Sequence, residues 1–173
     1  AVLTNTVANP APAGGTQFVC VGWVLTGNEP QEGAGVEMVM TLTNDAELVW
    51  RWMTNFWLET AAGLHGSVAP ATGWGGSGSN VEVVATADPY YHFTNWTGSV
   101  ESYDNPLFIL VAGPCSVTAY FAANMTTNMP TPEWWLAEHG FTNLFEEAVT
   151  NDADGDGVPT GEEYPADTNP TNG

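Results

Sequence analysis

An acidic loop near the carboxyl end has the residue types and the spacing of a divalent-cation site. Acids occupy its first, third, fifth and twelfth positions and glycine the sixth: Asp152, Asp154, Asp156, Glu163 and Gly157. A hard cation takes roughly six to eight oxygen ligands, and alternate side chains of a tight loop can turn toward one centre. Further ligands are expected from the backbone carbonyl of Val158 and the hydroxyl of Thr160. The spacing is that of the D-x-D-x-D-G-x5-E calcium loop, so we expect calcium as the cofactor.

Two alternatives to calcium remain for this loop. A solvated acidic turn would leave four carboxylates close together, and Arg51, the one Lys or Arg of the chain, lies far away in the sequence. Magnesium dehydrates reluctantly and prefers octahedral sites. Both alternatives suit the loop less well than calcium.

The residues around the loop predict a short helical module over residues 133–173. Thr131 and Pro132 are expected to cap and begin one helix, which Gly140 ends, and Thr142 is expected to cap a second helix over 143–149. Residues 132–172 resemble the bacterial thrombospondin type 3-like and dockerin-like calcium modules, which are common near the C-termini of exported proteins. Pro165 is expected to break the helix that such modules continue. A dockerin needs two loops, so cohesin binding is not expected.

The first 121 residues are typical of antiparallel β-strands, because apolar residues alternate in short stretches between turns rich in Gly, Pro and Asn. The predicted strands are 16–23, 36–42, 47–53, 55–60, 65–68, 81–87, 92–96, 107–111 and 116–121. We therefore predict a mainly β fold of tandem small antiparallel modules, followed by a short EF-hand-like calcium module. The expected division is an extended arm (1–15), a degenerate first module (16–54), a second module (55–122), a linker (123–132) and the helical module (133–173).

The second β module carries a family resemblance. Gly66-Ser-Val68, Gly73-Trp74, Tyr91 to Gly98 and Ser116 to Phe121 occur in this order, and together they resemble the divergent internalin-type B-repeat. Such repeats are small β modules strung along bacterial surface and secreted proteins. The resemblance covers about residues 55–122 and implies a non-catalytic spacer or adhesion role, without identifying a ligand.

The charge of the chain excludes several classes of partner. With 20 acidic residues, a single Lys or Arg and a formal charge of −19, the chain cannot neutralise a phosphate backbone or dock on anionic lipid. No apolar stretch is long enough to insert into a membrane. The N-terminus lacks a charged and an apolar region, so we expect any signal peptide to have been removed from a secreted, cell-surface protein.

The two cysteines, Cys20 and Cys115, form no C-x-x-C pair. In an exported chain this favours one disulfide between them. The alternative is two buried thiols, because spatial adjacency cannot be taken from spacing.

Tryptophans and hydroxyl residues suggest carbohydrate contacts. Trp50, Trp52 and Trp96 alternate with other residues on strands and are expected in the core. Trp23 and Trp74 follow glycines near turns, so they are the candidates for stacking against a ligand. Candidate glycan acceptors lie in or beside the linker: Asn124, Thr126, Thr127 and Thr131.

No arrangement of acids, histidines or nucleophiles matches an enzyme motif, so we expect a protein that is not an enzyme. The expected function is a structural or assembly role in a bacterial surface, matrix or extracellular filament, through self-association into a polymer or contacts with other surface proteins. The alternative is a carbohydrate-binding accessory module of a larger secreted enzyme, which would contact polysaccharide. Residues 1–15 are expected either to pair with the next subunit or to add a strand to their own sheet.

Overall fold

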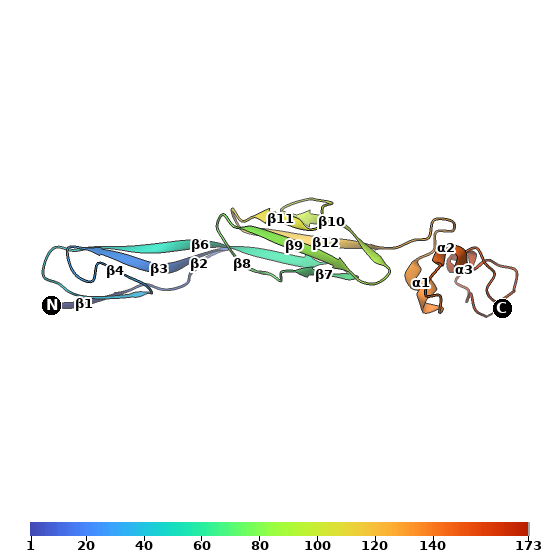
Figure 1. The fold of residues 1–173 in the computed structure, drawn as a ribbon, viewed down its shortest axis with the longest axis horizontal. Coiled ribbons are helices and arrows are strands. Elements are labelled where there is room, and N and C mark those ends of the chain that lie inside the picture. Colours follow the sequence, from blue (N-terminus) through green and yellow to red (C-terminus); the bar gives the residue numbers. More distant parts are fainter. Residues whose placement is uncertain (173) are drawn as a thin grey trace.

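The computed structural model describes residues 1–172 as an elongated molecule, with the two chain termini at opposite ends (Figure 1). It is mainly β with a short helical end, as predicted, and the described residues form three short helices where two were expected. The strands are β1 (Val2–Thr6), β2 (Ala11–Ala13), β3 (Thr16–Thr26), β4 (Glu32–Gly33), β5 (Glu37–Thr41), β6 (Glu47–Ala62), β7 (Gly66–Ala69), β8 (Gly73–Gly76), β9 (Asn80–Ala87), β10 (Tyr91–Gly98), β11 (Leu107–Leu110) and β12 (Cys115–Ala123). The helices are α1 (Glu133–Glu138), α2 (Phe145–Ala148) and α3 (Thr160–Ala166).

The first β module is a two-layer sandwich. Strands β1 and β5 form one antiparallel sheet, and β3 pairs with β6 in the other. Alternating apolar residues meet between the layers: Trp23, Leu25, Met38 and Met40 are buried, with Leu48 and Trp50 packed against them. The core is small, because β3, β5 and β6 contribute two side chains each and β1 contributes none.

Strand β6 joins the two modules. Over Glu47 to Phe56 it pairs with β3, and over Leu58 to Ala62 it pairs in parallel with β12. Strand β8 lies on its other edge, opposite residues 55–58. The expected boundary after residue 54 therefore falls inside one continuous strand of 16 residues.

The second β module contains the larger core. Strands β7, β9 and β11 form one sheet, which packs on β10, β12 and the end of β6. Trp96 is fully buried at its centre, and its indole N–H donates to the carbonyl of Asp104 at 3.0 Å. Val83, Val117 and Ala119 are also fully buried around it. The core role predicted for Trp96 is confirmed.

The N-terminal segment is part of the first module. Strand β1 pairs with β5 of its own chain, and β2 pairs with β3. Of the two expectations for residues 1–15, a strand added to the chain's own sheet is confirmed, and the extended arm is corrected, because the backbone groups bond inside the module. All five residues of β1 are nevertheless exposed.

The helical part differs from the expected boundaries. Thr131 does not cap α1. The N-cap residue of this helix is Pro132, which makes no side-chain cap bond. Helix α2 begins after Leu144, in a left-handed conformation, and not at a cap by Thr142. Pro165 lies inside α3, which ends one residue later. The carbonyl of Gly161, which would have accepted the N–H that proline lacks, instead lies 3.4 Å from the Thr131 hydroxyl.

Candidate metal centre and exposed aromatic surfaces

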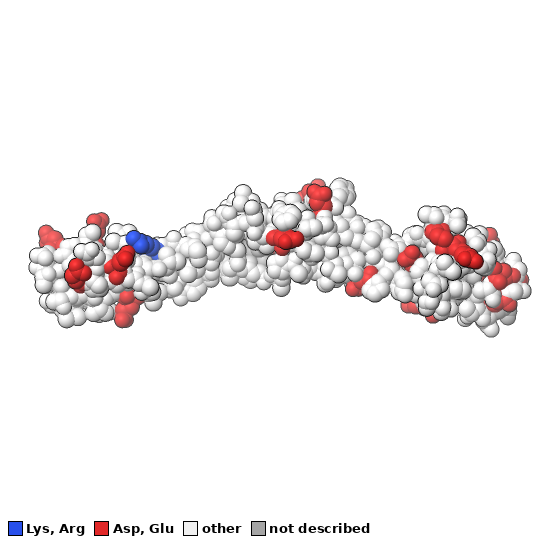
Figure 2. Space-filling model, viewed as in Figure 1, with Lys and Arg blue, Asp and Glu red and all other residues white. Residues whose placement is uncertain are grey.

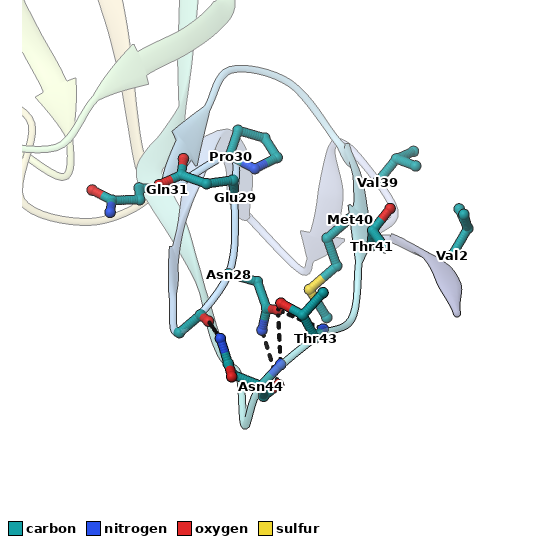
Figure 3. A pocket seen from close by; sticks show the side chains of 11 residues that line it. Val2, Asn28, Glu29, Pro30, Gln31, Val39, Met40, Thr41, Thr43 and Asn44 are labelled. Atoms are coloured by element: carbon teal, nitrogen blue, oxygen red, sulfur yellow. Dashed lines mark hydrogen bonds between the residues drawn. The ribbon is translucent and has the colours of Figure 1, made fainter.

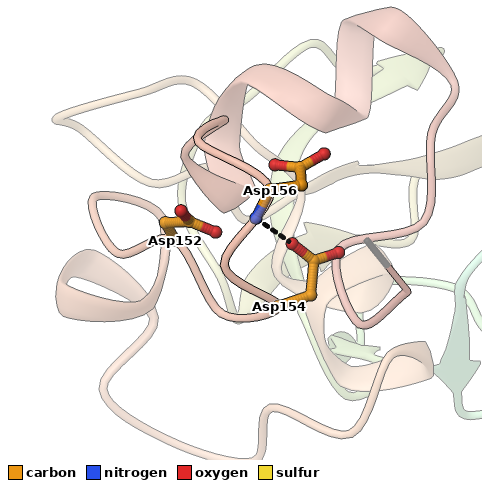
Figure 4. A group of neighbouring side chains, drawn as sticks. All are labelled: Asp152, Asp154 and Asp156. Carbon is orange, nitrogen blue, oxygen red and sulfur yellow. Dashed lines mark hydrogen bonds between the residues drawn. The ribbon is translucent and has the colours of Figure 1, made fainter.

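The acidic loop brings its three aspartates together. Oxygen atoms of Asp152, Asp154 and Asp156 all lie within 4.8 Å of one another (Figure 4). Asp154 is half-buried, whereas the other two are exposed. Three like charges at this separation repel one another unless a cation lies between them.

Backbone N–H groups of the loop fix the direction of these carboxylates. Asp152 accepts the N–H groups of Gly155 at 2.7 Å and Gly157 at 2.9 Å. Both glycines have positive φ, which favours residues without Cβ. Asp156 accepts the N–H of Val158 at 2.8 Å, and Val158 is half-buried at the turn into α3.

The first turn of α3 supplies the buried oxygens of the site. Thr160 is fully buried and Glu163 is 1% exposed. The buried atoms Asp154 Oδ2, Thr160 Oγ1 and Glu163 Oε2 have no hydrogen-bond partner. Since nearly all buried polar atoms in folded proteins are paired, three such oxygens on one loop need a further partner. Oxygen donors alone are the set that calcium prefers, so the residues fit that ion.

Electrostatics point the same way. Burial raises the pKa of Glu163, and the bond from the Thr168 hydroxyl opposes this shift. The charges of Asp154, Asp156 and Asp152 raise the pKa further. A carboxylate in this position is costly to ionise without a cation.

The loop is tied to the end of the β body. The buried Thr131 contacts Gly161 as described, and the carboxylate of Glu146 accepts the N–H groups of Thr127 at 2.7 Å and Asn128 at 3.2 Å. These bonds hold the pKa of Glu146 below its usual value, the bond from Thr127 contributing most. The expected linker 123–132 is therefore a turn held by the helical module, and not a free tether.

The two tryptophans predicted to stack on a ligand have different environments. Trp23 is 5% exposed and its indole N–H donates to the carbonyl of Glu37. The stacking role predicted for Trp23 is wrong, because β4 and β5 cover its ring. Trp74 is 40% exposed. Its ring packs edge-to-face on Trp57, with centroids 5.1 Å apart and planes at 70°.

Trp57 was missed by the sequence reasoning. It lies opposite Trp74 in the β6–β8 register. Side chains alternate between the two faces of β6, and the odd-numbered residues, Trp57 among them, lie on the face away from the core. That alternation was the available signal. Trp52, expected in the core, is 41% exposed, because no second layer covers β6 between the two modules.

The structure corrects two of the candidate glycan acceptors. Thr126 and Thr131 are buried, and each bonds to the other within the turn, so neither hydroxyl is accessible. Asn124 is half-buried, and its side chain contacts His92 and Glu133. Thr127 is exposed; its modification stays a prediction.

The predicted disulfide is wrong. Both cysteines are free thiols, Cys20 buried and Cys115 half-buried. Cys20 pairs with Trp52 and Cys115 pairs with Leu58 on β6, which places them about 20 Å apart along the strand at ~3.3 Å per residue. A disulfide requires Cα atoms within about 7 Å.

A hollow of about 910 Å³ lies at the N-terminal end (Figure 3). Its central polar residue is Asn28, whose side-chain oxygen accepts the N–H groups of Thr43 and Asn44 and whose amide donates to the carbonyl of Asn44. The side-chain amide of Asn28 therefore joins two turns, and its hydrogen-bonding groups are already paired within the chain. No histidine or cysteine lines this hollow.

The fold defines an elongated protein of tandem β modules with an acidic helical end. A family model for the divergent InlB B-repeat domain matches residues 56–125, which correspond to the second β module and the turn that follows it. The match indicates a bacterial surface-associated module, as the resemblance implied. Comparison with curated proteins and with solved structures yields no match. Within residues 1–172, no helix is long and apolar enough to cross a membrane.

Proposed function

We propose that the chain is a non-catalytic, extracellular structural subunit of a bacterial surface, matrix or filament, and that calcium holds its C-terminal module. The observation that carries the assembly role is β6, one strand continuous through both β modules. Because the chain termini lie at opposite ends of the resulting rod (Figure 1), neighbouring copies can follow one another along a line. The B-repeat match of the second module supports a surface location.

The calcium role rests on the three unpartnered buried oxygens of the loop. Calcium would take ligands from Asp152, Asp154, Asp156 and Glu163, with Val158 and Thr160 as further oxygen donors. Calcium supplies positive charge there, while the residues orient their oxygens and exclude water from the helix end. Native mass spectrometry and calorimetric titration should find one calcium per chain. Asp152→Ala should abolish binding, while Asp167→Asn should not, because Asp167 is an exposed acid outside the loop and asparagine tolerates its left-handed conformation.

Assembly is tested by sedimentation of the full chain over a range of concentrations, with calcium and with a chelator. We expect polymers in calcium. A monomer at every concentration in calcium contradicts the structural role, whatever the calcium titration shows.

A carbohydrate-binding role would need a flat aromatic platform. Trp57 and Trp74 are exposed, but their planes stand at 70°, so they do not offer one surface to a sugar chain. We therefore prefer the structural role. Retention of the chain on insoluble neutral polysaccharide, lost in Trp74→Ala, would reverse this preference.

A further inference from the structure

The structure has a narrow neck between its two β modules. We define the neck as β2 with residues 16–21 of β3 and residues 48–54 of β6. Beyond Trp50 the sheet is a single layer, because the first core ends at Trp23 and Trp50 and the second begins at Leu58; Leu48 and Trp50 themselves pack in the first core. Figure 1 shows only these strands crossing between the modules.

Apolar side chains are exposed on both faces of the neck. Phe18 and Trp52 are 38% and 41% exposed on one face, beside a hollow of about 450 Å³ that Ala11 and Thr54 also line. On the opposite face, Met53 is 48% exposed. Exposed apolar groups clustered in this way mark contact surfaces.

The neck also has an open backbone edge. Over residues 47–53, β6 pairs only with β3. The carbonyl of Thr54 accepts the N–H of Ser77 on the edge of β6 that faces away from β3. Backbone groups of alternate residues point to the same edge of a strand, so the N–H and C=O groups of Leu48, Trp50 and Trp52 also point to that edge. These groups are ready to pair with another strand.

An open strand edge selects its partner by chemistry. Its N–H and C=O groups are satisfied in register by an extended polypeptide, and the apolar groups beside it need a mostly apolar strand. A chain of charge −19 repels its own copies, so they can meet most easily where carboxylates are absent. On the face in Figure 2, the stretch of the rod between Arg51 and the second module carries no acidic residue, while Arg51 itself lies 4.0 Å from the carboxylate of Glu32.

The chain itself carries a strand that fits. Strand β1 has no charged side chain and is exposed at all five positions. Ala1 accepts the N–H of Leu42, and Val7 donates its N–H to Val36, at the two ends of β5. The backbone groups of the odd-numbered residues of β1 therefore point to β5, and those of Val2, Thr4 and Thr6 point outward. The outer edge of β1 has no partner strand in residues 1–172.

We propose that the neck binds a second copy of the chain, whose β1, still paired with its own β5, adds to the open edge of β6. This proposal rests on the assembly role proposed above. The contact joins two different surfaces, so each copy offers one free β1 and one free neck. Repetition of this contact gives an open chain of copies, and not a closed dimer.

Two variants of the full chain test the contact, measured by sedimentation in calcium. Met53→Glu places a charge on the neck, and Thr4→Pro removes an outward N–H of β1 without removing a bond to β5. Each should raise the concentration at half-assembly at least tenfold. The matched control is Phe108→Glu, since Phe108 is 65% exposed on the second module; it should assemble like the unaltered chain.

Hydrogen exchange on the unaltered chain gives a readout that does not depend on any variant folding. The amides of Trp50 and Trp52 should exchange rapidly in the monomer and become protected on assembly. If the chain assembles while these amides stay unprotected, or if both variants assemble normally, the neck contact is wrong and the assembly role stands. If the chain remains monomeric, the assembly role itself fails. Protection by a neutral polysaccharide in the monomer would also overturn the proposal.

Discussion

Exchanging Glu163 for glutamine should change the stability of the helical module in opposite directions with and without calcium. The carboxylate is 1% exposed, and one of its oxygens has no partner. Glutamine keeps the size of the side chain and an oxygen that can accept the Thr168 hydroxyl, but it removes the charge. Without calcium, a neutral amide costs less to bury than a carboxylate. With calcium, the same change would remove one of the anionic ligands proposed above.

The free energy by which a cation stabilises the helical module can be estimated from the loop geometry. Charges at the 4.8 Å limit of the aspartate oxygens repel by about 0.9 kcal/mol per pair at the dielectric of water. Three pairs give about 3 kcal/mol that a cation relieves, close to the ~2.7 kcal/mol that a ligand supplies at 100 times its Kd. For a small module this corresponds to at least about 10 °C in Tm. If the variant binds calcium 100-fold more weakly, it retains only about 0.4 kcal/mol at that concentration.

The assay is thermal unfolding followed by the indole NMR signals of Trp134 and Trp135, because both rings contact Tyr164, next to Glu163. Relative to the unaltered chain, Glu163→Gln should lower the Tm of the helical module in calcium. In chelator, its Tm should be equal to that of the unaltered chain or higher. The control, Glu162→Gln, changes an exposed neighbour and should do neither. The reasoning is refuted if calcium does not change the Tm of the unaltered chain, or if the glutamine variant shifts it equally in both conditions.

Three further changes test the fold and its joint. Trp96→Ala should cost about 3–5 kcal/mol in urea unfolding of the second module, because it empties the centre of its core. Gly161→Ala should destabilise the helical module by about 1–3 kcal/mol in thermal unfolding, because a Cβ there would lie 2.7 Å from Met129; Gly113→Ala, with open space around it, is the control. The Glu146 carboxylate has a lowered pKa, so its contribution is present above the ordinary pKa of glutamate and lost as pH falls through the lowered value. Exchange of the Thr127 amide should accelerate over that range and in Glu146→Gln, but not in Glu147→Gln.

The strands were predictable because their side chains obey a two-residue period. Predicted stretches such as 16–23 and 81–87 lie within β3 and β9. The same period could not show that 47–53 and 55–60 are one strand, since Thr54 and Asn55 resemble a turn in composition. Strand β8 was missed because Gly73-Trp-Gly-Gly76 has almost no side chains to alternate.

The loop was predictable at the level of residues because its spacing is set by the chemistry of coordination. The aspartates do meet as expected. The sequence could not show that Thr131 would be buried against α3, since that contact joins residues 30 positions apart. For the same reason the cysteine pairing failed: composition favoured oxidation, while strand register, a three-dimensional property, keeps the thiols apart.

The continuity of β6 has a mechanical consequence. A load that separates the two β modules along the rod runs through β6, which transmits it to β3 in one half and to β12 in the other. The hydrogen bonds of each strand pair are then loaded together, in shear, and cannot break one after another. Rupture must slide a whole strand past its neighbour. Force spectroscopy should therefore find the β body opening at higher force than the helical end, whose contacts to the rod are few and short.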